Sequence, residues 1–162
     1  MTLTQKETTL LTDLKEQEAL CKEKYTKYAQ DARCPQLSGI FMQLASVEGQ
    51  HYDTITQMMN GTVPPMQAKE PPKEQPEMKP YSYQNEQDKS ADEFLCKDML
   101  AMEKHVSSVY DTCVFEFCNP DARYTLNHIQ TEEQEHGDKL YKFMSANGMQ
   151  YTKTAISKRG SR

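Results

Sequence analysis

The sequence predicts an all-α protein, an antiparallel four-helix bundle made of a duplicated helical hairpin. Apolar residues recur at helical spacing in four stretches. A set of four polar residues occurs once in each half of the chain, and a constant shift of 85 residues carries one set onto the other. A single proline-rich stretch separates the halves. We therefore predict helices over residues 4–33, 36–60, 90–118 and 120–147.

The first hairpin, residues 4–60, is bounded by local signals. Thr4 and Glu7 form a capping box, in which each side chain satisfies a backbone amide at a helix start. Pro35 ends the first helix and suits the first position of the second. The second helix is expected to stop at Asn60 and Gly61, a favourable pair at a helix C-terminus.

The second hairpin, residues 90–148, shows the same kinds of helix-boundary signals. Ser90 and Glu93 have the spacing of another capping box. Asn119 and Pro120 indicate the N-cap and first turn of the last helix, which is expected to end at residues 147–148.

The segment over residues 61–89 is predicted to be a long crossover between the hairpins. It holds six of the eight prolines, which cannot occupy a helix interior. An extended proline-rich chain covers roughly 3.1 Å per residue, enough to cross a helix of about 40 Å. We then expect helices 2 and 3 to be parallel, and likewise helices 1 and 4. Residues 1–150 are predicted to form one domain, and residues 151–162 a solvated basic tail.

The composition of the chain argues against several classes of function. The chain has 162 residues, 36% hydrophobic and 27% charged, and its net charge of −5 argues against nucleic-acid binding. No apolar run approaches the roughly 18 residues of a membrane span, and the N-terminus lacks a signal-peptide core, so we expect cytoplasmic synthesis. The cysteines contain no C-x-x-C pair, which disfavours a cysteine-ligated metal. They are either small buried hydrophobes or, near helix ends, oxidative cross-linking sites; the five are Cys21, Cys34, Cys96, Cys113 and Cys118.

The repeated set predicts a metal site with two ions. Each half carries a single Glu, a Tyr seven residues later, and a Glu-x-x-His pair thirty residues after the first Glu. One Glu from each of two helices and a Glu-x-x-His from each of the others is what a carboxylate-bridged two-metal site in a bundle requires. The predicted ligands are Glu18, Glu48, His51, Glu103, Glu133 and His136.

The spacing brings these ligands to one height. Glu18 lies about 16 residues before the first turn, and Glu48 and His51 about 14 and 17 residues after it, which is roughly 20–25 Å along each helix. The same count holds around the second turn. Glu48 and Glu133 are expected to bridge two iron or manganese ions, which suit hard carboxylates with imidazoles.

The flanking residues receive other roles. Tyr25 and Tyr110 lie two turns from each single Glu, where a phenol can donate a hydrogen bond to a ligating carboxylate. His105 and His128 lack the motif and are expected to be surface or rim residues. Asp53 and Asp138 point off the ligand face and are expected in hairpin packing or at the surface, and Glu132 and Glu135 are expected to be solvated.

The pattern resembles known families. The duplicated Glu18-x6-Tyr25 and Glu48-x-x-His51 arrangement resembles the rubrerythrin and ferritin-like superfamily over nearly all of residues 4–148. The second half is more similar to the spore coat F family of endospore-forming bacteria. That resemblance rests on the run from Glu103 through Asn119-Pro120 and the EEQEH segment to Tyr151.

These resemblances imply two functions. The coat F resemblance implies a spore coat protein that is made in the mother-cell cytoplasm, deposited in the coat and bound to other coat proteins, with homo-oligomerisation left open. The ferritin-like resemblance implies a di-iron or di-manganese site on the six ligands, and so a peroxidase or ferroxidase as the alternative. The four-cysteine module of rubrerythrin is missing, so electrons would need a separate partner. We place coat assembly first and leave enzymatic activity open.

Overall fold

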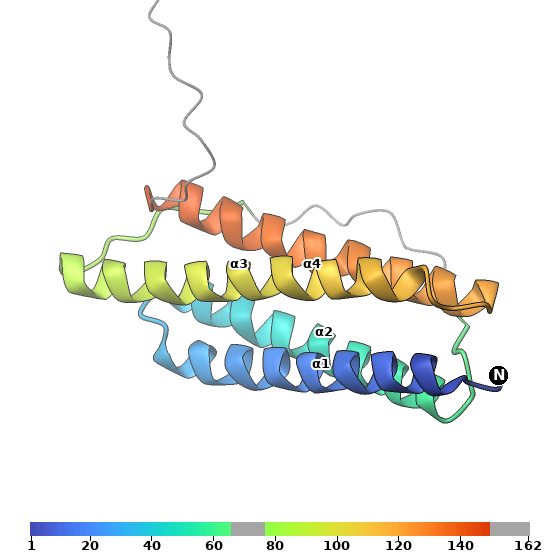
Figure 1. Ribbon diagram of the computed structural model, residues 1–162. Helices are drawn as coiled ribbons and strands as arrows, with labels where there is room; N and C mark the ends of the chain where they lie inside the picture. Colours follow the sequence, from blue (N-terminus) through green and yellow to red (C-terminus); the bar gives the residue numbers. More distant parts are fainter. Residues whose placement is uncertain (66–76, 150–162) are drawn as a thin grey trace, which may run out of the picture.

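The computed structural model describes residues 1–65 and 77–149, which form four α-helices and no strand. The helices are α1 (Gln5–Asp31), α2 (Pro35–Met59), α3 (Glu86–Val114) and α4 (Pro120–Ala146). Figure 1 shows α1 and α2 as one antiparallel hairpin and α3 and α4 as another, with their tight turns at opposite ends of the bundle. Helices α2 and α3 run in the same direction, as do α1 and α4. The predicted all-α four-helix bundle is confirmed.

Most predicted helix ends are confirmed by their capping contacts. The Thr4 hydroxyl accepts a hydrogen bond from the Glu7 amide, and the Glu7 carboxylate accepts one from the Thr4 amide. Pro35 lies in the first turn of α2, and the Asn119 side chain caps α4. The stops after α2 and α4 use Gly61 and Gly148, whose φ angles of 84° and 62° lie in the left-handed region that favours glycine.

The predicted bounds of α3 are wrong at both ends. The helix begins at Glu86, four residues before Ser90, because the Asn85 side chain accepts a hydrogen bond from the Asp88 amide at 2.8 Å and caps it there. Ser90 lies inside the helix and caps nothing. At the other end the helix stops at Val114, since residues 115–119 are needed to turn the chain into α4.

Two buried acids anchor the turns from the opposite hairpin. Asp92 is fully buried and accepts hydrogen bonds from the Arg33 and Cys34 amides, at 2.8 and 2.9 Å, in the α1–α2 turn. Glu7, 85 residues earlier, accepts one from the Cys118 amide at 3.3 Å, beside the α3–α4 turn. Each hairpin therefore pins the turn of the other, which holds the helices in register.

The hydrophobic core is divided into two clusters. One includes Tyr25, Phe41 and Phe143, and the other includes Leu14 and Leu126. A layer of buried Glu and His side chains occupies the middle of the bundle. The core thus closes both ends of this layer and shields it from water.

The crossover is described only at its ends. Residues 61–65 leave one end of the bundle and residues 77–85 arrive at the other (Figure 1). There the Tyr81 amide donates to the Asn147 side chain at 2.8 Å, and the Tyr83 hydroxyl donates to Asp92. The rest of the predicted crossover, and the predicted basic tail, lie outside the described residues. Among the described helices, none is long and apolar enough to span a membrane.

Candidate metal centre

The structure brings all six predicted ligands together at mid-bundle. Helices α1 and α3 contribute one Glu each, and α2 and α4 contribute a Glu-x-x-His pair each, because residues three apart share a helix face. Every one of these residues is at most 5% exposed. They come from helices that are distant in sequence, so the bundle itself assembles the cluster.

The six side chains form two overlapping groups. Glu18, Glu48, His51 and Glu133 make the first group, which we call the His51 position. Glu48, Glu103, Glu133 and His136 make the second, the His136 position. Within each group the potential ligand atoms all lie within 4.8 Å of one another. Glu48 and Glu133 belong to both groups, which is the arrangement required of bridging carboxylates.

The imidazole Nδ1 atoms point into this cluster. His51 Nδ1 lies 2.9 Å from Glu133 and 3.4 Å from both Glu18 and Glu48. His136 Nδ1 lies 2.9 Å from Glu48 and 3.6 Å from Glu103. The two rings are stacked, with centroids 5.7 Å apart. Each ring nitrogen therefore converges with carboxylate oxygens on one small volume.

Much of this polar surface has no hydrogen-bond partner. The buried atoms that have no hydrogen-bond partner are both carboxylate oxygens of Glu48 and of Glu133, one oxygen each of Glu18 and Glu103, and the Nδ1 atoms of both histidines. The Nδ1 contacts are short, but their directions do not make hydrogen bonds. Burying a polar group unpaired costs about 1–3 kcal/mol, and more for a charged group. Such a cluster needs a cation or protons to compensate it.

Burial and crowding perturb the acid–base properties of the cluster. Burial raises the pKa of Glu18 from 4.5 to about 7. Burial and the neighbouring Glu103 carboxylate also raise the pKa of Glu133 well above its ordinary value. Burial acts in the same direction on Glu48, but His136 and His51 outweigh it and lower its pKa. For both histidines burial lowers the pKa and the surrounding carboxylates raise it more, to about 9 for His136. Protons are thus held tightly where cations could bind.

The two tyrosines orient the single glutamates across the hairpins. The Tyr25 hydroxyl donates to Glu103, and the Tyr110 hydroxyl donates to Glu18. Both phenols are fully buried, and burial raises their pKa well above 10, so each stays protonated and remains a donor. A hydrogen bond of this kind fixes which carboxylate oxygen faces the cluster.

Sequence reasoning missed one residue of this site. Glu132, expected to be solvated, accepts a hydrogen bond from His51 Nε2 at 2.9 Å, and its side chain is 27% exposed. It also lies 3.5 Å from His128, a partly buried side chain, as expected for a residue at the rim. The bond directs the Nδ1 atom of His51 inward. The repeat could not reveal Glu132, because residue 47, its counterpart, is Val.

The other side chains set aside as non-ligands lie outside both groups. His105, Asp53 and Asp138 are exposed, and Asp138 pairs with Lys142 at 2.5 Å. Four of the five cysteines are buried, and the exposed one is Cys118. Burial raises the pKa of Cys21 and Cys96, which keeps those thiols protonated and unreactive. The reading of cysteines as small buried hydrophobes therefore holds for four of them.

The donor set fits two divalent first-row cations. Four carboxylates and two imidazoles are hard to intermediate ligands of the kind that iron and manganese take in proteins. The unpaired oxygens supply the negative charge that two such ions would neutralise. Fold and site together define a four-helix bundle with a buried carboxylate–histidine centre.

Comparison with known proteins adds one match. Residues 91–154 match the family model described as the Coat F domain. The match covers α3 from residue 91 onward, all of α4 and residues 147–154, as the resemblance of the second half predicted, and it leaves the first hairpin uncovered. No curated protein and no solved structure matches the chain.

Proposed function

We propose that this protein is a component of the bacterial spore coat whose helical bundle encloses a ferritin-like centre for two iron or manganese ions. The observation that carries the coat assignment is the Coat F domain match over residues 91–154. The observation that supports the centre is the pair of overlapping ligand groups at mid-bundle.

Each ligand has a distinct role in this proposal. Glu48 and Glu133 would hold both ions, and Glu18 and Glu103 would hold one ion each. His51 and His136 would each hold one ion, and it is their Nδ1 atoms that face the cluster. Tyr25 and Tyr110 hold the Glu103 and Glu18 carboxylates in place.

The centre would join the two hairpins. The His51 position combines three ligands from α1 and α2 with Glu133 from α4, and the His136 position combines three from α3 and α4 with Glu48 from α2. Bound ions would therefore cross-link the bundle from within, and would stabilise the folded chain more as the free ion concentration rises above the dissociation constant. A coat protein needs such durability.

The coat assignment implies a location and partners. The protein would be made in the mother cell, deposited in the coat and held there by other coat proteins or by copies of itself. Three exposed aromatic side chains offer contact surface for such assembly: Phe94 in the third turn of α3, Phe115 directly after α3, and Tyr124 in the second turn of α4.

One observation favours a second candidate function, a rubrerythrin-like peroxidase or ferroxidase. A cavity of about 320 Å³ between α3 and α4 is lined by the ligands Glu103 and Glu133. A metal pair supplies redox chemistry when it is bound and open to small molecules. The chain's own contribution would be to position the pair and to exclude water from its other sides.

The test separates these candidates with one double variant. A fluorescent fusion of the chain, expressed in a sporulating endospore-forming bacterium, should form a ring at the developing spore surface. The Glu133→Ala, His136→Ala variant removes ligands, and Glu16→Ala, His105→Ala removes the same residue types at exposed positions as the control. Diffuse fluorescence of the wild-type fusion would contradict the coat assignment.

Turnover of the purified proteins decides the second candidate. Iron-loaded wild type and both variants should be assayed for peroxide consumption and for oxidation of ferrous iron. If the wild type and control turn over and the ligand variant does not, while all three still localise to the coat, the centre is catalytic. If the loaded wild type shows no turnover, the structural role stands.

A further inference from the structure

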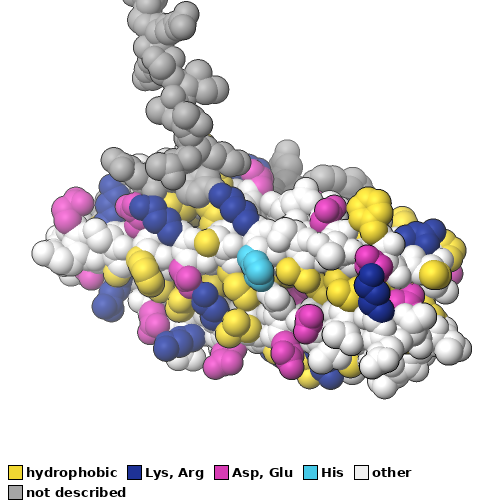
Figure 2. Space-filling view, viewed as in Figure 1, with side chains coloured by type: hydrophobic (Ala, Val, Ile, Leu, Met, Phe, Trp, Pro, Cys, Tyr) yellow, Lys and Arg dark blue, Asp and Glu magenta, His cyan; other side chains and the backbone are white. Residues whose placement is uncertain are grey.

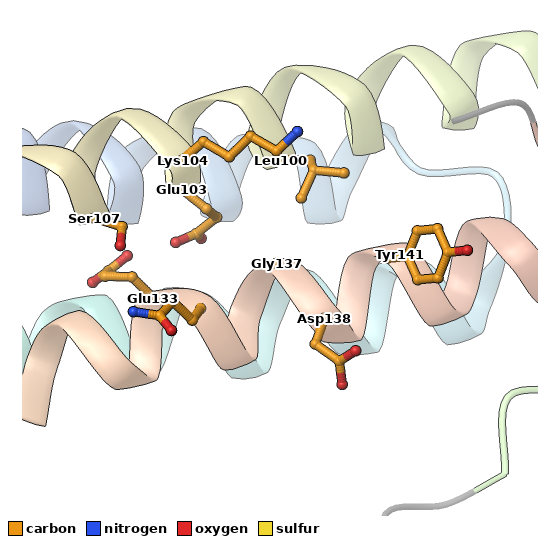
Figure 3. Close-up of a pocket in the computed structure, with 9 residues that line it drawn as sticks. Leu100, Glu103, Lys104, Ser107, Glu133, Gly137, Asp138 and Tyr141 are labelled. Carbon is orange, nitrogen blue, oxygen red and sulfur yellow. The ribbon is translucent and has the colours of Figure 1, made fainter. Parts of the chain in front are cut away.

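In the part of the chain that the structure describes, a cavity reaches the candidate metal centre through the second hairpin, between α3 and α4. The cavity between α3 and α4 reaches Glu103 and Glu133, and Leu100, Gly137 and Tyr141 form its apolar wall (Figure 3). Both glutamates are at least 98% buried and direct unpartnered oxygens into the cluster. The cavity is large enough to admit several water molecules.

Gly137 keeps this opening wide. A Cβ atom at Gly137 would lie 3.3 Å from the Leu100 side chain, so a side chain at this position would press against Leu100 and narrow the space between α3 and α4. The repeat places Tyr52 at the equivalent position of the first hairpin and Lys15 opposite it, in place of Leu100. The Lys15 ammonium lies 5.0 Å from the centre of the Tyr52 ring, so these two side chains bridge α1 and α2 where the second hairpin is open.

The two histidines also differ in how firmly their rings are held, and again the His51 position is the more enclosed one. His51 Nε2 is held by Glu132, which fixes the ring as a ligand. The residue that the repeat places opposite His136 is Val47, whose side chain can accept no hydrogen bond. Within residues 1–65 and 77–149, the His51 position is thus both closed by Tyr52 and braced by Glu132, whereas the His136 position has neither feature.

The charge of the opening suits a cation. Three acidic side chains line it, Glu103, Glu133 and Asp138, together with Lys104, and Asp138 is paired with the ammonium group of Lys142. A cleft lined mainly by one sign of charge concentrates counter-ions of the other sign.

We propose that the two metal positions are unequal: the His136 position exchanges divalent cations with solvent through the opening at Gly137, and the His51 position retains its ion. This inference rests on the proposed metal centre. It assigns the cavity as an entry and exit route for divalent cations and makes Gly137 the residue that determines its width.

The test follows the loss of Mn²⁺ from the loaded full-length protein to excess EDTA, by elemental analysis at timed intervals. The wild type should lose one ion quickly and the other slowly. Gly137→Tyr should still bind two ions but slow the fast phase by about tenfold, a rise of about 1.4 kcal/mol in the exit barrier. Gly137→Ala, the smaller change, should slow it less, and it serves if the larger side chain prevents folding.

Two further variants sharpen the result. Tyr52→Gly should open the first hairpin and speed the slow phase, and Glu132→Val should do the same by releasing His51. Gly39→Ala is the control, because Gly39 lies in α2 with open space around its Cβ position and should leave both phases unchanged.

The outcomes separate this inference from the proposed metal centre. A wild type that binds two ions but releases them in one phase, or a Gly137→Tyr protein that releases both at wild-type rates, overturns the route and leaves the centre intact. If the wild-type protein binds neither Mn²⁺ nor iron, the proposed metal centre is wrong, and the proposed exchange route is wrong with it.

Discussion

Replacing Glu18 by Gln should have opposite effects on the metal-free and the metal-loaded protein. The side chain is fully buried, and burial raises its pKa from 4.5 to about 7. The native state therefore binds this proton more tightly than the unfolded chain does, so the associated stability is complete below pH 4.5 and is lost as the pH rises through 7. Since one pKa unit corresponds to 1.36 kcal/mol, ionised Glu18 at pH 8 costs the metal-free fold about 3 kcal/mol.

Glutamine has the same shape, carries no charge and can still accept the Tyr110 hydrogen bond. Glu18→Gln should therefore raise the unfolding free energy of the metal-free protein at pH 8 by up to about 3 kcal/mol, and should change it little at pH 4.5, where Glu18 is already protonated. With Mn²⁺ added, the same variant should be less stable than the wild type, because it has lost a ligand.

Urea unfolding followed by circular dichroism measures these differences, with and without EDTA. Glu16→Gln, an exposed change in the same helix, should stay within about 0.5 kcal/mol of wild type in every condition. If Glu18→Gln destabilises the metal-free protein at pH 8, then Glu18 serves as an ion-pair partner of His51 and the reasoning from burial is wrong.

Three further predictions concern the surroundings of the cluster. Tyr110→Phe removes the donor to Glu18 and should lower the unfolding free energy by about 1.5–3 kcal/mol. The control Tyr124→Phe, at an exposed position, should lower it by less than about 0.5 kcal/mol. Asp92→Ala leaves the Arg33 and Cys34 amides and the Tyr83 hydroxyl without their acceptor. It should lower the unfolding free energy by about 3 kcal/mol or more, measured by the same urea titration. The rise in melting temperature caused by Mn²⁺ should grow from pH 6 to pH 8, because the pKa of His136 is raised to about 9 and protons compete with the metal.

Each of these has a contrary outcome. Equal effects of the two Phe substitutions would show that the Tyr110 bond contributes nothing to stability. An Asp92→Ala protein as stable as wild type would show that the α1–α2 turn does not depend on this anchor. A Mn²⁺ effect that falls as the pH rises would mean that the ion binds somewhere other than at the histidines.

The bundle and its ligand set were predictable because both follow from local spacing. Glu48 and His51 share a helix face by periodicity alone, and their distance to the turn fixes their height against Glu18. The second half of the chain repeats the same spacing of ligands and turn, so it predicts the same arrangement independently. The wrong start of α3 shows the limit of local signals: Ser90 and Glu93 have capping-box spacing, but Asn85 caps the helix four residues earlier.

The asymmetry of the centre could not be predicted from the repeat. Glu132 and Gly137 act through what they face on another helix, and neither has a counterpart of the same type in the first half. The crossed hydrogen bonds of Tyr25 and Tyr110 also depend on how the hairpins pack, since spacing within one hairpin cannot specify a partner in the other.

The metal content of the purified protein tests the account most directly. Elemental analysis of protein produced with iron and manganese supplied should find about two ions per chain in the wild type, as a bundle with a bridged two-metal site requires. Glu48→Ala removes a bridging ligand from both positions and should lose most of this metal. A wild-type content near zero, unchanged in Glu48→Ala, would contradict the proposed centre.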